Sequence, residues 1–337
     1  MKRHSIIMAA MLMTGAAVTS CSDGNNKEAA PIIGKKQMTI ENRRLTPEAL
    51  WAMGRIGAVS VSPDAQCVVY GVSYYSVELN KSHHTLHIMN ADGSNQQLLT
   101  TTAANETSAA WIKGGTKIAF LSNESGSNQV WEMNPDGSGR KQLTNEESDI
   151  EGFLFSPDET KVVLVKRIKI KETTADVHPD LPLAKGFVVN DLMYKHWDEW
   201  ITDAPHPFIA TFDGTTISGS KDILEGTTYD CPNRPFGGTE QLAWSPDSKK
   251  LAYACNKKTG RDYSVSTDTD IYLLDIESNE TQNLCKLDDA RSNYGYDTAP
   301  TFSPDGNHLA WLSMKRDGYE SDQNRLCIMN IKSGEQK

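Results

Sequence analysis

Short apolar runs of strand composition, each entered through a tight polar turn, recur along this chain of 337 residues. Successive turns lie about 44 to 58 residues apart, except for one interval of about 89 residues. A period near this length is typical of β-propeller blades, each of which holds four antiparallel strands. Four turns are Ser-Pro-Asp runs and one is a degenerate copy: Ser62–Asp64, Ile112–Gly114, Ser156–Asp158, Ser245–Asp247 and Ser303–Asp305. The pattern predicts an all-β propeller with about five blades.

Each repeat has the same internal order, which distinguishes it from a chance recurrence of turn residues. Proline fixes φ inside the first turn and aspartate bonds nearby backbone, so the flanking runs form a hairpin. A second turn follows at Asn90–Gly93 and at Asn134–Gly137, where Asp-Gly favours a tight reversal. Short outer strands are then expected at Gln97–Thr100 and Lys141–Thr144. A β-sandwich with similar turns is the alternative, but sandwiches lack this self-similarity.

The last repeat begins near Thr301 and reaches its second turn at Lys332–Glu335, so Lys337 falls where the outer strand should start. An unfinished blade exposes unpaired strand backbone, which folded proteins avoid. We therefore expect the N-terminal part of a longer protein, in which residues 44–337 form a partial propeller with an incomplete last blade. A closed ring of five blades is the alternative.

The N-terminal residues have the features of an export signal. A basic start precedes a short apolar run, Ile6–Val18, and small residues then lead to Cys21. This arrangement resembles a bacterial lipoprotein signal, so we expect residues 1–20 to be cleaved and Cys21 to receive lipid. An ordinary secretory signal with an incidental cysteine is the alternative. Residues 21–43 are predicted to be a flexible polar tether, and no later run approaches the roughly 20 apolar residues that span a bilayer.

Composition and charge add two expectations. The formal net charge is −10 and no basic cluster occurs, which argues against a nucleic-acid partner. The cysteines that follow Cys21 are odd in number and lie in apolar strand settings, so most are predicted to be buried thiols. Their spacing predicts no pairing among Cys67, Cys231, Cys255, Cys285 and Cys327.

The sequence contains no motif for a metal site or a catalytic nucleophile. His83, His84 and His87 lie close together, but neighbouring side chains of a strand point to opposite faces and no further ligand stands at metal spacing. A solvated loop is the predicted setting of these histidines, and neither a metal nor another cofactor is predicted. A Gly-x-Ser-x-Gly nucleophile elbow is also missing, so no catalytic residue is predicted.

The long interval between Ser156 and Ser245 breaks the repeat, which predicts an insertion at about 166–240 or a blade whose turn markers have faded. This interval contains Tyr194–Trp200, a run with two tryptophans, a histidine and two carboxylates. Aromatic rings supply contact area and carboxylates can hold an ammonium group, so the run is a candidate binding surface. Alternatively, Trp197 and Trp200 pack one blade against the next.

Two runs resemble motifs of a known enzyme family. Tyr194–Trp200 resembles the Arg/Lys-His-Trp-Asp-x-Trp element of bacterial dipeptidyl peptidases of the prolyl oligopeptidase family, and Met314–Leu326 resembles their Gly-Tyr/Phe-Glu-Ala-Asp-Arg-x-Arg-Leu stretch. Leu45–Glu48 is similar to their opening helix, with Thr46 as N-cap and Pro47 at the first helical position. The resemblance implies a propeller that admits short peptides to an α/β-hydrolase domain with a Ser-Asp-His triad. This sequence lacks that domain, so we expect no peptidase activity from the chain alone.

The resemblance also implies how an oligopeptide substrate is held. In related dipeptidyl peptidases, acidic side chains of the propeller bind the substrate α-ammonium, which fixes the cut two residues from the N-terminus. The candidates lie in the two family-like runs or in the predicted insertion: Asp198, Glu199, Glu225, Glu320 and Asp322. For each of them, a solvated surface carboxylate is the alternative.

A second class of function stays open. Propellers similar to the periplasmic translocation protein TolB carry related Ser-Pro-Asp repeats and bind proteins without catalysis, and fold alone does not choose between the two. The family-like runs favour the substrate-gating propeller of an exported, lipid-anchored dipeptidyl peptidase at the periplasmic side or cell surface of the outer membrane. Its expected partners are oligopeptides and the missing hydrolase domain.

Overall fold

The computed structural model describes residues 32–38, 40, 43–190, 192–286 and 295–337. The predicted signal at 1–20, the predicted lipidation residue Cys21 and most of the predicted tether lie outside the described residues. Residues Ile33–Lys337 belong to one structural unit, and the following description concerns that unit.

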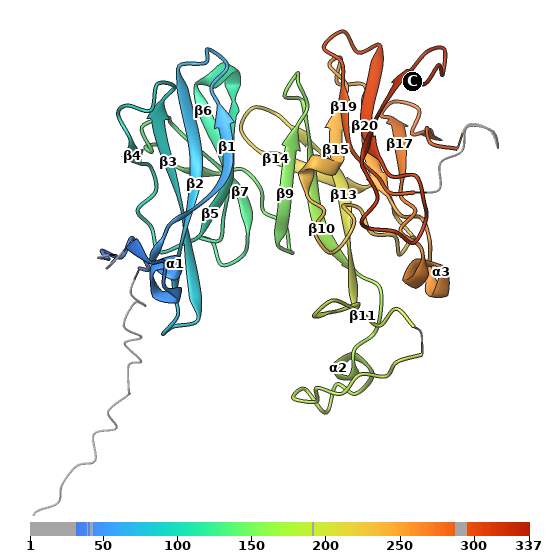
Figure 1. Cartoon of the computed structure of the whole chain (residues 1–337), viewed down its shortest axis with the longest axis horizontal. Coiled ribbons are helices and arrows are strands. Elements are labelled where there is room, and N and C mark those ends of the chain that lie inside the picture. Colours follow the sequence, from blue (N-terminus) through green and yellow to red (C-terminus); the bar gives the residue numbers. More distant parts are fainter. Residues whose placement is uncertain (1–31, 39, 41–42, 191, 287–294) are drawn as a thin grey trace, which may run out of the picture. The chain divides into compact units, whose positions relative to one another are not determined.

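Five antiparallel sheets of three or four strands follow one another in chain order in the described part of the chain, and we number them one to five (Figure 1). Sheet one contains β1 (Arg55–Val61), β2 (Cys67–Ser76), β3 (Lys81–Asn90) and β4 (Gln97–Leu98). Sheet two contains β5 (Glu106–Ile112), β6 (Lys117–Ser122), β7 (Gln129–Met133) and β8 (Lys141–Gln142). Sheet three contains β9 (Ile150–Phe155), β10 (Lys161–Lys169), β13 (Asp203–Phe212) and β14 (Ile217–Asp222). Sheet four contains β15 (Leu242–Trp244), β16 (Lys250–Cys255), β17 (Asp270–Asp275) and β18 (Thr281–Asn283), and sheet five contains β19 (Asp297–Phe302), β20 (His308–Ser313) and β21 (Arg325–Asn330).

This arrangement confirms the all-β, propeller-type fold predicted from the repeats. The predicted outer strands are present as β4 and β8, although each is only two residues long. After β21 the chain makes a single bridge, between Met329 and Gln336, so sheet five has three strands.

The Ser-Pro-Asp turns owe their repeated shape to one hydrogen-bond pattern. The Ser245 hydroxyl donates to Asp247 Oδ1 (2.6 Å) and accepts from the backbone N–H of Lys250 (2.8 Å). The hydrogen bond from Ser245 lowers the pKa of Asp247, because the ionised carboxylate accepts it best. Ser62 makes the same pair of bonds in sheet one. The serine hydroxyl therefore stabilises the turn by joining its aspartate to the first residue of the next strand.

Short helices occupy the connections. α1 (Pro47–Ala52) begins as predicted, because the Thr46 hydroxyl accepts from the N–H of Ala49 at 3.2 Å and proline occupies the first turn. The others are the 3-10 turns η2 (Lys113–Gly115) and η3 (Thr239–Gln241) and the helices α2 (Thr174–Val177) and α3 (Gly260–Val265). None of the helices in the described residues combines the length and apolar character needed to cross a membrane.

The predicted insertion at 166–240 is wider than the segment that leaves the sheet. β10 and β13 pair from Lys161 with Thr211 to Lys169 with Asp203, and residues 170–190 and 192–202 extend beyond the sheet between them (Figure 1). That segment contains α2 and the hairpin of β11 (Lys195–His196) and β12 (Glu199–Trp200). Residues 203–222, which the prediction had included, form the third and fourth strands of sheet three.

The prediction of a solvated loop around the histidine triplet is wrong. His83, His84 and His87 all lie on β3, and His83 is buried, with its ring nitrogens against the carbonyls of Ile33 (3.2 Å) and Ala104 (3.0 Å). The strand was not predicted because many of its ten residues are polar, yet its backbone pairs with β2 along its whole length. The three rings bind separate protein partners rather than converging on one point.

The apolar core lies between the sheets rather than within any one of them. Four clusters of buried side chains are described, and each joins two consecutive sheets: one with two, two with three, three with four, and four with five. Three of the cysteines outside the N-terminal segment, Cys231, Cys255 and Cys285, are buried as predicted, whereas Cys67 and Cys327 are half-buried; no bond joins any of these five sulfurs in this structure.

A repeated tryptophan locks neighbouring sheets together. Trp111 Nε1 donates to the carbonyl of Ser60 in the preceding sheet (3.1 Å), and Trp244 Nε1 donates in the same way to Leu154 (3.1 Å). Each tryptophan immediately precedes the turn between the first two strands of its sheet. Burial of the ring and satisfaction of a neighbouring carbonyl thus come from one side chain.

Trp244→Phe should lower the free energy of unfolding by about 1–2 kcal/mol more than Trp131→Phe. Both substitutions replace an indole with a smaller ring, but Trp131 Nε1 has no hydrogen-bond partner among the described residues. Urea unfolding followed by circular dichroism measures the difference. Equal losses in the two variants would contradict a stabilising role for the bond between sheets.

Candidate functional site

A groove of about 810 Å³ opens between the insertion of sheet three and the connections of sheets four and five. This volume lies within the range of small-molecule and peptide sites. Asn256 and four segments line the groove: the β11–β12 hairpin with Met193, the loop Asn233–Phe236, the region of α3 from Tyr263 to Thr269, and the last sheet with Tyr296, Met314, Gly318, Glu320 and Ser321. None of the five sheets uses these loop residues to form its core clusters.

Two exposed aromatic rings form one mouth of the groove. Trp197 stands in the two-residue turn between β11 and β12 with a φ of 54°, an uncommon conformation for a bulky residue. Its ring meets Phe236 edge to face at 5.0 Å. The side chains of Trp197 and Phe236 are 68% and 75% exposed, so this apolar pair is available to a ligand.

The second tryptophan of the family-like run has a different place. Trp200 stacks on Phe187 at 3.9 Å with an angle of 6° between the rings, so it stabilises the insertion itself. Neither tryptophan packs one sheet against the next in these contacts, which was the alternative considered for both.

A buried ion pair holds the floor of the groove. Arg234 Nε and Nη2 donate to the two oxygens of Asp230 at 3.0 and 2.7 Å, and the Tyr263 hydroxyl from α3 also donates to Asp230. Burial alone would lower the pKa of Arg234, but the hydrogen bonds and charge of Asp230 outweigh it and raise that pKa. Burial and the same carboxylate raise the pKa of Tyr263. Paired charges at this depth fix the loop and α3 in one geometry.

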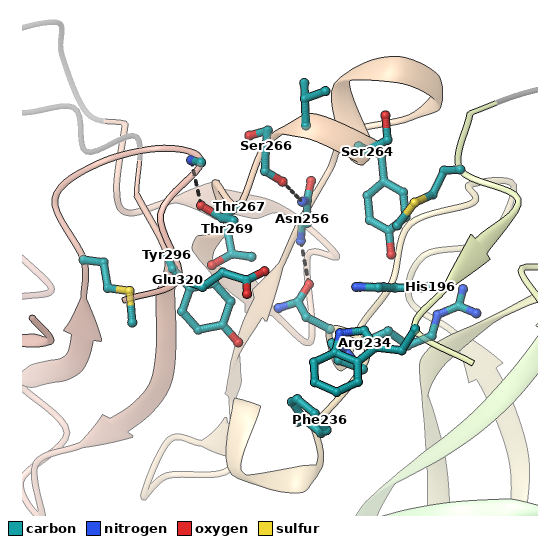
Figure 2. Close-up of a pocket in the computed structure, with 18 of the residues that line it drawn as sticks. His196, Arg234, Phe236, Asn256, Ser264, Ser266, Thr267, Thr269, Tyr296 and Glu320 are labelled. Atoms are coloured by element: carbon teal, nitrogen blue, oxygen red, sulfur yellow. Dashed lines mark hydrogen bonds between the residues drawn. The ribbon is translucent and has the colours of Figure 1, made fainter. Parts of the chain in front are cut away.

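The guanidinium of Arg234 has unused donor capacity. Its Nη2 also donates to the carbonyl of Asp203 at 2.6 Å, whereas Nη1 is buried and has no partner within the described residues. The side chain is 5% exposed and lines the groove (Figure 2). A buried N–H without an acceptor is costly, so a ligand oxygen that reaches it gains binding energy.

A carboxylate lies on the other wall. Glu320, from the connection between β20 and β21, stands with Tyr296 on the side of the groove opposite His196 and Arg234 (Figure 2). No ion pair of Glu320 is described in these parts of the chain, and its side chain is exposed. Burial raises the pKa of Tyr296, and the charges of Glu240 and Glu320 raise it further. Glu320 is thus the carboxylate that this wall presents to the groove.

The other predicted carboxylates lie outside the groove lining. Asp198 and Glu199 are exposed on the β11–β12 hairpin, and Glu199 approaches Arg167 at 3.6 Å. Glu225 is exposed in the turn after β14. Asp322 forms an ion pair with Arg316, so it orders the loop that carries Glu320. Of the five candidates, Glu320 alone lines the groove.

One buried group has the spacing of metal ligands. Asp270, Cys285 and Asp297 bring possible ligand atoms within 4.8 Å of one another. Lys286 Nζ donates to Asp270 Oδ2 at 2.8 Å and Trp311 Nε1 donates to Asp297 Oδ1 at 3.0 Å. Protein donors thus already contact both carboxylates of this group.

The position of Cys285 has equivalents elsewhere in the chain. Its sulfur accepts from the N–H of Ile271 at 3.3 Å, as the hydroxyls of Thr100 and Thr144 accept from N–H groups of the third strand in sheets one and two. Cys285 therefore fills a place in the repeat that threonine fills in other blades, and we assign the cluster to blade structure.

Sequence reasoning missed most of the groove. Asp230, Arg234, Phe236 and Tyr263 belong to no motif and to no periodic pattern. For Asp230, Arg234 and Phe236 the one available signal was their position between Ser156 and Ser245, where the repeat spacing fails; Tyr263 lies outside that interval. Loops with no role in a repeat are common places for function.

Comparisons with known proteins give the chain its relatives. A family model described as TolB beta propeller domain matches residues 36–184. Dipeptidyl-peptidase 5 of Porphyromonas gingivalis is 46% identical over 311 residues, which cover 91% of this chain and 45% of that protein. Dipeptidyl-peptidase 5 of Porphyromonas endodontalis is 40% identical over 325 residues, which cover 96% of this chain and 45% of that protein. The chain thus spans about half the length of the curated relatives it matches.

Solved structures agree on the fold. Acylaminoacyl peptidase of Pyrococcus horikoshii superposes with a TM-score of 0.58 over 86% of this chain and 39% of that chain. The sequence identity in that superposition is 13%, so the similarity concerns architecture alone.

Asp230→Asn should lower the free energy of unfolding by about 3–5 kcal/mol, because it leaves the Arg234 guanidinium buried without its counter-charge. Asp322→Asn is the matched control, since its partner Arg316 is 57% exposed and such pairs contribute about 1 kcal/mol or less. Urea unfolding of both variants tests this. A loss at Asp230 no larger than that at Asp322 would show that the floor of the groove does not depend on the pair.

Proposed function

We propose that this chain, which is homologous to the N-terminal part of dipeptidyl-peptidase 5, is the propeller that admits and positions peptides for an exported serine peptidase. The groove is the proposed binding site for the N-terminal end of a short peptide. One observation carries this proposal. Glu320 lies on one wall of the groove, and on the other wall Arg234 has an N–H group without a partner among the described residues.

The chemistry of a peptide N-terminus suits these two walls. An α-ammonium seeks a carboxylate, and the first carbonyls of the chain seek N–H donors, so Glu320 and Arg234 would fix the end of an extended peptide. Trp197 and Phe236 would cover an apolar side chain between them. A fixed distance from the bound ammonium to a catalytic serine would determine where the peptide is cut.

Release of dipeptides, the serine triad and the hydrolase domain are proposals for the whole protein, since this chain spans about half of its curated relatives. We assign the chain no catalytic residue. We further propose that the protein is an exported lipoprotein in which Cys21 carries the lipid, with residues 21–43 as the tether to the membrane.

A TolB-like module that binds folded proteins is a second candidate function. It is favoured by the family model, which covers sheets one and two and part of sheet three. That match does not reach the loops of sheets four and five that line the groove. Binding of short peptides would therefore use the groove, whereas binding of folded proteins need not. A binding experiment with short peptides distinguishes the two candidate functions.

The chain should bind a tetrapeptide with a free N-terminus at least about tenfold more tightly than its N-acetylated form, because acetylation removes the charge that Glu320 would hold. Glu320→Gln should abolish that preference while binding of the acetylated peptide stays the same. Isothermal titration with both peptides gives the two affinities.

Glu225→Gln is the control for this experiment, since Glu225 is an exposed carboxylate away from the groove lining. It should keep the full preference for the free N-terminus. Loss of the preference in Glu225→Gln, or its survival in Glu320→Gln, would remove the role assigned to Glu320. Binding of neither peptide would favour the TolB-like alternative.

Cys21→Ser should abolish incorporation of a labelled fatty acid into the protein in cells that express it, because the serine hydroxyl does not replace the thiol in lipoprotein maturation. Ser22→Ala is the matched control and should be labelled as the wild type is. Mass spectrometry of the membrane fraction reads out the label. An unlabelled wild type would leave an ordinary secretory signal as the better interpretation.

A further inference from the structure

We propose that Cys231 and Cys255 form a disulfide that ties the floor loop of the groove to the end of β16. No other pair among the described cysteines is proposed. Spacing along the sequence gave no pairing, because the link joins a loop to a strand that lies in a different hairpin. The register of the backbone brings the two residues together.

The register is set by one antiparallel bridge. Asp230 pairs with Asn256, so the next residue of one segment, Cys231, lies opposite the preceding residue of the other, Cys255. Opposed residues of antiparallel strands have Cα atoms about 4.5–5.5 Å apart, within the range that a disulfide spans. The Cys255 sulfur also donates to the carbonyl of Asp230 at 3.4 Å, which places it beside the backbone of its partner.

Both residues are held in place by other bonds. The N–H of Cys231 donates to the carbonyl of Pro205 on β13 at 2.9 Å, and Cys255 is the last residue of β16 in its pairing with β17. Both are 0% exposed and belong to the cluster between sheets three and four.

The disulfide would affect the groove through Asp230 and Arg234, which lie close to Cys231 in sequence. Asp230 precedes Cys231 and holds Arg234, whose loop continues to Phe236 at the mouth. A covalent link at Cys231 therefore constrains the segment that supplies one wall. This inference depends on the proposed export in one respect only: export would bring the protein into a compartment that supplies an oxidant.

The oxidant is a small-molecule or protein disulfide. One cysteine thiolate attacks a sulfur of the oxidant, forming a mixed disulfide and releasing one thiolate of the oxidant. The second cysteine thiolate then attacks the protein sulfur of that mixed disulfide and releases the other half. Two protein thiols become one disulfide, the oxidant becomes two thiols, and the two protons pass from the cysteines to the released thiolates.

Burial determines when this exchange can occur. Burial raises the pKa of the Cys231 thiol well above its usual range, and the hydrogen bond with Cys255 raises it further. The thiolate is the attacking species, so the folded, reduced protein should react slowly. The bond should therefore form while the chain folds, before sheets three and four close over the pair.

The experiment refolds the whole chain from a reduced, unfolded state in a mixture of oxidised and reduced glutathione. Remaining thiols are blocked with iodoacetamide in denaturant, and the protein is digested and analysed by mass spectrometry. The expected result is a linked peptide pair containing Cys231 and Cys255, with Cys67, Cys285 and Cys327 alkylated. Reduction in denaturant should release the pair, and the reduced protein should melt about 5 °C or more below the oxidised one.

Cys231→Ser and Cys255→Ser should each lose this difference in melting temperature between oxidised and reduced samples, and Cys327→Ser is the matched control that should keep it. Alkylation of both Cys231 and Cys255 in the refolded wild type would overturn the proposal, as would frequent linkage of either to another cysteine. The peptide map of the wild type decides the question even where a variant fails to fold. It is also independent of the peptide-binding experiment, so the two proposals can fail separately.

Discussion

Each sheet in this protein is stable because it buries its faces against the next sheet, and every other feature depends on that constraint. The buried apolar side chains form four clusters, each between consecutive sheets, and tryptophans donate hydrogen bonds across two of these interfaces. Strands are therefore committed to packing. The residues that line the groove belong mainly to connections between strands, and they take no part in the four core clusters.

The groove combines a rigid floor with an open mouth. Asp230, Arg234 and Tyr263 exchange charge-assisted hydrogen bonds below the surface, which holds the loop and α3 together. Above them, Trp197 and Phe236 are exposed and contact each other edge to face. A floor whose charges are already paired costs little reorganisation when a ligand arrives. The exposed rings can then respond to the size of an apolar side chain.

The sequence predicted what is local and repeated, and missed what is distant. Ser245 and Asp247 predict a turn because the bonds that form it join residues a few positions apart. The cap at Thr46 is local in the same sense. His83 defeated the prediction, since its setting depends on Ile33 and Ala104, which are far from it in sequence. Likewise, the sequence could not distinguish among the five acidic candidates for binding an ammonium group. Only the tertiary structure places Glu320 in the groove lining and Asp322 in an ion pair with Arg316.

The imidazole of His83 has a mechanical consequence. It lies between the carbonyls of Ile33 and Ala104, so it joins the segment before α1 to the connection between sheets one and two. A pulling force applied to the chain ahead of Ile33 would enter the fold at β3, through that ring and the ten paired residues beside it. The load would be borne as shear by the first sheet, while the groove between the later sheets lies several interfaces away. The first sheet would thus carry the tension, and the loops that line the groove would stay undeformed.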